Sequence, residues 1–140
     1  MKRRNKLRCR LSMTLLVAGA YPVWILGFTW WHVLRSDLAG GRHGPLDAYR
    51  HALASAAVSY TLGEWAVNLV TRVFEGTGKN SNAMDSHNNR VGARIGSTVS
   101  SFAEIEPAVR EGVRLGRVDA VASTQITWMP EKKWRSGSLW

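Results

Sequence analysis

The stretch of sequence that decides the fold reads Met84-Asp85-Ser86-His87-Asn88-Asn89-Arg90-Val91-Gly92. It places an acid, an imidazole and two amides within five residues, directly before an apolar run with helical spacing. A polar group that is buried without a partner costs about 1–3 kcal/mol. These side chains are therefore either solvent-facing turn residues or members of a hydrogen-bonded polar site.

A second acid and imidazole precede this stretch, in Asp47-Ala48-Tyr49-Arg50-His51. This segment opens an alanine-rich region with helical periodicity, which predicts a helix over residues 46–62. Asp47, His51 and Ser55 are spaced by four residues and so line one polar face of that helix. We expect this face and the Met84–Gly92 stretch to be two halves of one site.

These residue types suit hydrolytic chemistry. His51 would serve as the general base, with Asp47 and Asp85 orienting it. Asn88 and Asn89 carry amide groups that could polarise a substrate and steady developing negative charge. We therefore treat these five residues as candidate catalytic residues.

A divalent metal ion is a second interpretation, with His51, Asp85 and His87 as candidate ligands. The spacing matches no specific metal motif such as His-Glu-x-x-His. A third interpretation is purely structural. In that case Asp47 pairs with Arg50, His51 bonds a carbonyl group, and Asp85 caps the helix that follows it.

The basic charge of the chain is concentrated at its N-terminus. The formal net charge is +9, and six Lys or Arg residues lie in the first ten positions without an acid among them. From Ser36 onward twelve basic residues face ten acidic ones, so the net charge there is 12 − 10 = +2. The main domain has neither a basic face nor a pattern of stacking aromatics, and we therefore expect no nucleic-acid partner.

Residues 11–34 contain no formally charged side chain. As a helix these 24 residues would measure about 36 Å, which exceeds the roughly 30 Å of a bilayer's hydrocarbon core. With the basic cluster held in the cytoplasm, the segment predicts an inner-membrane anchor with a periplasmic main domain. Two alternatives are a signal peptide cleaved after Ala18-Gly19-Ala20 and a buried core helix.

The rest of the chain predicts a mainly α protein, in which a transmembrane helix or signal peptide precedes one compact domain of about four helices. Gly92 and Gly96 form a smooth ridge that should let one helix lie close against its neighbour. Residues 75–83 are expected to form a loop, and residues 117–129 an extended end piece. The predicted boundaries are a basic segment at 1–10, the anchor at 11–34, a linker at 35–45, the helical domain at 46–129 and a loosely ordered basic aromatic tail at 130–140.

The sequences Asp-Ala-Tyr-Arg-His-Ala (47–52) and Met84–Gly92 resemble the two motifs of an uncharacterised bacterial domain family, Asp-Ala-x-Arg-His and Met-Asp-x-x-Asn-Asn-x-x-Gly. The resemblance covers about residues 45–120. Members include small exported proteins and the terminal domains of polymorphic toxins. The resemblance implies a bacterial envelope or secreted protein but no reaction, and the site residues it implies are Asp47, Arg50, His51, Asp85, Asn88 and Asn89.

Two functions follow as expectations. The first is a membrane-anchored or exported envelope protein with a hydrolytic or metal-binding site, acting on lipid or peptidoglycan. The second is a non-enzymatic component of an envelope, secretion, conjugation or phage-derived assembly, in which the polar cluster is structural. Both predict the membrane and other envelope proteins as partners.

Overall fold

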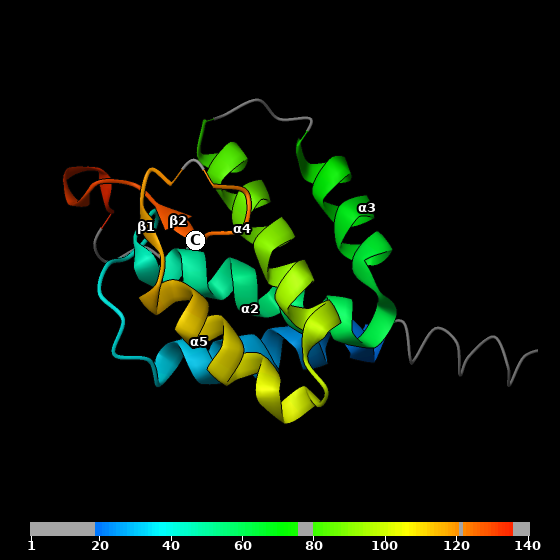
Figure 1. Cartoon of the computed structure of the whole chain (residues 1–140). Helices are drawn as coiled ribbons and strands as arrows, with labels where there is room; N and C mark the ends of the chain where they lie inside the picture. The colour runs from blue at the N-terminus through cyan, green and yellow to red at the C-terminus, as the bar shows by residue number, and fades with distance from the viewer. Residues whose placement is uncertain (1–18, 76–79, 121, 136–140) are drawn as a thin grey trace, which may run out of the picture.

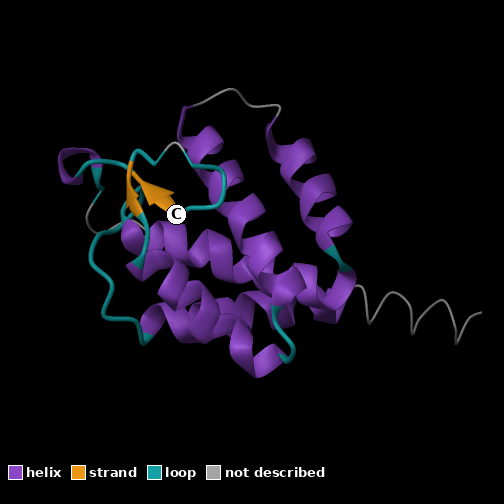
Figure 2. Ribbon diagram, viewed as in Figure 1, coloured by secondary structure: helices purple, strands orange, loops and turns teal. Residues whose placement is uncertain are grey.

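The computed structural model describes residues 19–75, 80–120 and 122–135, and this part of the chain is mainly helical, as predicted (Figures 1 and 2). A helix over residues 19–34 is followed by four more helices that form a compact bundle with it. A two-stranded sheet lies at one end. The bounds of the labelled helices are Pro45–Leu62 (α2), Glu64–Glu75 (α3), Asn80–Thr98 (α4) and Ile105–Arg114 (α5).

Helix α2 lies at the centre of the bundle and contacts α3, α4 and α5 (Figure 1). It begins at Pro45, whose fixed φ and missing N–H suit the first helical turn. It ends before Gly63, which has a φ of 93° that a residue with a side chain rarely adopts. The predicted helix at 46–62 is therefore confirmed to within one residue.

Helix α4 lies against α2 with the two backbones in close contact. A Cβ atom at Gly92 would overlap the backbone of Ala52, and a Cβ atom at Gly96 would overlap the backbone of Ala56. Both alanines are completely buried. The glycine ridge predicted from the sequence thus faces an alanine ridge, and this contact fixes how α2 and α4 cross.

The hydrophobic core fills the space between α2, α5 and the C-terminal strand. Helix α5 contributes Ile105, Val109 and Val113, which are spaced by four residues and buried. From α2 come Tyr49 and Leu53, both with no exposed surface. Steps of three and four residues between apolar positions are typical of such a buried helix face.

The helix at 19–34 packs on this bundle with one face. Ile25, Thr29 and Val33 are buried, and Val33 belongs to the main core. Within the described residues no helix is both long enough and apolar enough to cross a membrane. The predicted anchor at 11–34 extends into residues 1–18, which lie outside the described part together with the predicted basic segment, so the anchor stays a prediction.

The C-terminal segment returns to the bundle as a short parallel pair of strands, Arg117–Val118 (β1) and Thr127–Trp128 (β2). These are the extended pieces expected between residues 117 and 129. Beyond them, the backbone N–H of Arg135 donates to the carbonyl of Arg42 at 3.0 Å. Residues 130–135 are thus attached to the domain rather than loose as predicted, whereas residues 136–140 lie outside the described part.

The start of α4 differs from the prediction. A loop was expected at 75–83, with Asp85 capping a helix that starts near residue 88, yet α4 begins at Asn80 and Asp85 lies inside it. Asn and Ser have low helix propensity because their side chains compete for backbone hydrogen bonds, and this suggested a loop. Packing against α2 overrides that preference.

Candidate functional site

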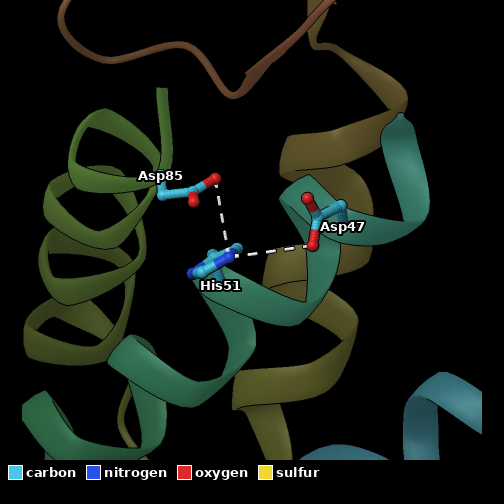
Figure 3. A group of neighbouring side chains, drawn as sticks. All are labelled: Asp47, His51 and Asp85. Atoms are coloured by element: carbon cyan, nitrogen blue, oxygen red, sulfur yellow. Dashed lines mark ion pairs between the residues drawn. The ribbon is translucent and has the colours of Figure 1, made fainter. Parts of the chain in front are cut away.

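The N-terminal half of α2 and the facing turn of α4 bring two acids to one imidazole (Figure 3). Nε2 of His51 lies 3.7 Å from Oδ1 of Asp47 and 3.5 Å from Oδ1 of Asp85. The three side chains can each offer a ligand atom such that all lie within 4.8 Å of one another. The two sequence segments that were expected to form one site therefore do meet in space.

Asp47 is held in place within this cluster by burial and hydrogen bonds. Its side chain is 1 % exposed, and both of its oxygens accept hydrogen bonds. Oδ1 accepts from Nη2 of Arg50 at 2.6 Å, and Oδ2 accepts from the backbone N–H of His43 at 2.8 Å. The Asp47–Arg50 pair is the one that the structural interpretation predicted, and it makes Asp47 a positioning group.

His51 is held as a neutral imidazole. Nη2 of Arg50 lies 3.0 Å from Nε2, and because a guanidinium only donates, Nε2 must accept. The ring proton is then on Nδ1. Asn89 also hydrogen-bonds the ring, and Oδ1 of Asn89 is in turn fixed by the hydroxyl of Ser55 at 3.0 Å.

Burial lowers the pKa of His51 below its ordinary value of 6.5, although the charges of Asp85 and Asp47 oppose this effect. The imidazole is therefore unprotonated at neutral pH. Its side chain retains 24 % exposure, so a small molecule can approach the ring. These properties suit a general base or a metal ligand.

Asp85 is the second acid of the cluster. Its Oδ1 is buried and has no hydrogen-bond partner among the described residues. Burial raises its pKa, and the nearby Asp47 charge raises it further, whereas a protonated His51 would lower it. An acid with a raised pKa and an imidazole with a lowered pKa thus lie side by side, and the two groups titrate as a pair.

His43 is a member of the cluster that the sequence analysis placed in a linker. It has a φ of 72°, which is uncommon for a residue with a side chain. Its backbone N–H binds Asp47, and its carbonyl accepts the N–H of Met129 at 3.0 Å. The ring is 8 % exposed, and its Nδ1 lacks a partner within the described residues. A positive charge on this ring would lower the pKa of Asp85. The His-Gly-Pro entry to α2 was the available signal.

Two of the predicted site residues lie elsewhere. Asn88 is completely buried and binds the backbone of Thr127 twice, donating from Nδ2 to the carbonyl at 2.8 Å and accepting the N–H on Oδ1 at 3.0 Å. Nε2 of His87 donates to the carbonyl of Gln125 at 2.7 Å. Positions 85 and 89 share the face of α4 that meets α2, whereas 87 and 88 face the C-terminal segment.

Fold and site together define a small helical domain with a paired acid–imidazole cluster between two closely packed helices. Residues 35–113 match the family model described as a domain of unknown function (DUF6973), and the chain belongs to this family. The match covers the whole cluster and begins where the helix at 19–34 has ended. Neither a curated protein nor a solved structure matches the chain.

Proposed function

We propose that the cluster is a hydrolytic acid–base site in which His51 acts as the general base. The observation that carries the proposal is the 3.5 Å separation between Nε2 of His51 and Oδ1 of Asp85. His51 is neutral, and once Arg50 no longer donates to Nε2, this nitrogen can take a proton from an attacking water or hydroxyl group. Asp85 can accept or return that proton, because its raised pKa brings it closer to the pKa of the ring.

Arg50 sets the substrate preference of this site, and Asn89 helps to orient the imidazole. Arg50 is 20 % exposed and carries a fixed positive charge beside Nε2, so it favours a substrate with a negatively charged or strongly polarised oxygen. Asn89 also holds the imidazole by a hydrogen bond. In this proposal Asn89 is a positioning residue, Asp47 positions Arg50, and Asn88 contributes only to the fold.

A divalent metal ion is the second candidate. Two ligand atoms at about 2.0–2.1 Å from a tetrahedral zinc ion are roughly 3.3–3.4 Å apart, and the separations of 3.5 and 3.7 Å in the cluster come close to this. The unpartnered oxygen of Asp85 also favours a ligand. However, Nη2 of Arg50 already contacts both Asp47 and His51, and its charge opposes a dication. The donor set therefore fits a metal only after Arg50 has withdrawn, with Asp47 in place of the predicted His87.

The proposed location is the bacterial envelope, with the N-terminus in the cytoplasm and lipid or peptidoglycan as the accessible substrate. The uncharged segment at 11–34 and the basic cluster before it support this location. A non-enzymatic role in an envelope, secretion, conjugation or phage-derived assembly is the alternative. The complete hydrogen bonding of Asp47 favours it, because such a carboxylate also stabilises a fold.

The test incubates the full-length protein with phospholipid vesicles and, separately, with purified peptidoglycan. Released fatty acids and soluble fragments are the readouts. His51→Ala and Asp85→Asn should each lower the rate by about 100-fold or more, because a general base contributes 10²–10⁴-fold. His87→Gln and Asp119→Asn, an imidazole and an acid outside the cluster, should leave the rate unchanged.

Three results would contradict the proposal. The first is full activity in both cluster variants. The second is a loss of activity that only follows a loss of folded protein in thermal melts. The third is the absence of any release from either substrate. Isothermal titration calorimetry with zinc tests the metal candidate. Zinc binding that disappears in His51→Ala and Asp85→Asn would support it.

A further inference from the structure

The helix at 19–34 has an inner face that belongs to the domain. Ile25, Thr29 and Val33 follow one another at steps of four and are 6, 2 and 2 % exposed. On the same side Phe28 stacks against Phe102, with ring centroids 4.9 Å apart. Because Phe102 lies just before α5, these contacts tie the helix to the bundle.

The outer face of this helix is apolar where a helix on a water-exposed surface would be polar. Four large side chains, Val23, Leu26, Trp31 and Leu34, are 55–75 % exposed. Helical spacing places Val23, Trp31 and Leu34 opposite the buried stripe. Single exposed hydrophobic residues are common, but such a group on one helix indicates an interaction surface.

Positive charge flanks this surface on both sides along the chain. Six Lys or Arg residues lie in positions 2–10, and residues 1–34 contain no acid. At the other end, the guanidinium of Arg35 lies 3.8 Å from the centre of the Trp31 ring. Tryptophan, leucine and basic residues on one helix are the combination that binds at the interface of an anionic lipid bilayer.

We propose that the outer face of the helix at 19–34 docks on an anionic phospholipid surface while its inner face stays on the domain. The helix would lie in the plane of the headgroups and hold α2–α5 against the bilayer. This arrangement differs from a membrane-crossing anchor, in which the helix would leave the domain. It would keep the N-terminus and the domain on the same side of the bilayer, so it is an alternative to the location given with the proposed function. It is independent of the acid–base chemistry proposed for His51.

The experiment measures co-sedimentation of the full-length chain with vesicles of phosphatidylcholine alone and with 30 % phosphatidylglycerol. We expect at least tenfold tighter binding to the anionic vesicles, with a loss of tenfold or more when the salt is raised from 50 to 500 mM. The double variant Trp31→Ser/Leu34→Ser should weaken binding at least tenfold. Leu69→Ser, which changes an exposed leucine on α3, should bind as the wild type does.

Any of the following outcomes would overturn the proposal. Equal binding to both vesicle types, or an unchanged double variant, removes the anionic lipid surface as the occupant. Resistance to a carbonate wash at pH 11 would show a membrane-crossing segment instead. A dimer that the double variant disrupts, without vesicle binding, would assign the face to a second copy. A variant with Lys2, Arg3 and Arg4 changed to Gln tests the charge without touching the folded helix, and it should also bind more weakly.

Discussion

Substituting Gly92 by Ala tests the close contact between α2 and α4. The added methyl group would overlap the backbone of Ala52, which cannot rotate away as a side chain can. Overpacking usually costs about 1–3 kcal/mol and occasionally more. Because backbone is the obstacle here, we place the cost at about 3 kcal/mol, at the upper end of that range. Alanine regains about 1 kcal/mol of helix propensity over glycine.

The expected net loss in the free energy of unfolding is thus about 2 kcal/mol, or a fall in Tm of about 6–8 °C. Urea unfolding followed by circular dichroism measures it. Gly27→Ala is the matched control, because no atom lies within 4 Å of a Cβ atom there. That variant should be as stable as the wild type or slightly more stable. If Gly92→Ala is equally stable, the helices can separate without cost and the contact does not fix their crossing.

Four further substitutions probe the site and the core. Asn88→Ala removes two hydrogen bonds to the backbone of β2 and should cost about 2–4 kcal/mol, with faster amide exchange in that strand than in α5; unchanged exchange would contradict the role of Asn88. Asp85→Asn should lower the pKa of His51 further in an NMR titration, because the Asp85 charge is the largest effect that raises it; a higher pKa would refute the pairing. Because the folded-state pKa of His51 is lowered, the contribution of His51 to stability is present above a pH of about 6.5 and is lost as the pH falls through the folded-state pKa. The stability of His51→Gln should therefore depend less on pH in this acidic range. Tyr49→Phe removes a 2.8 Å hydrogen bond to Glu106 and should cost about 1 kcal/mol in urea unfolding, while Glu106 keeps its bond to the neighbouring arginine; a loss above about 3 kcal/mol would mean that the hydroxyl has a larger role than this bond.

Local sequence patterns were sufficient to predict those elements whose bounds depend on neighbouring residues. The proline at the start of α2 and the glycine at its end each act within a few residues, and the helix predicted at 46–62 is found at Pro45–Leu62. The facing ridges of Gly92 and Gly96 also predicted the close helix pair that brings Asp85 to His51.

What the sequence could not provide depends on contacts between distant residues. The sequence alone makes Asn88 a catalytic candidate because its amide could polarise a substrate, and only the fold reveals that the amide binds strand β2. The linker residue His43 enters the site because Asp47 and Met129 fix its backbone from two directions. The lack of charged residues at 11–34 predicts a membrane anchor. The buried stripe of the helix at 19–34 becomes visible only in the folded structure.

The backbone contact between α2 and α4 also has a mechanical consequence. On α2, Ala52 directly follows His51, and on α4, Gly92 lies about two helical turns after Asp85. Since neither Gly92 nor Ala52 has a side chain that could yield, and Gly96 meets the backbone of Ala56 about one turn further on, the two contacts hold the helices at one crossing angle. A change in this angle would widen or narrow the gap between acid and imidazole. The separation of His51 and Asp85 therefore depends on how the two helices cross as well as on side-chain conformation.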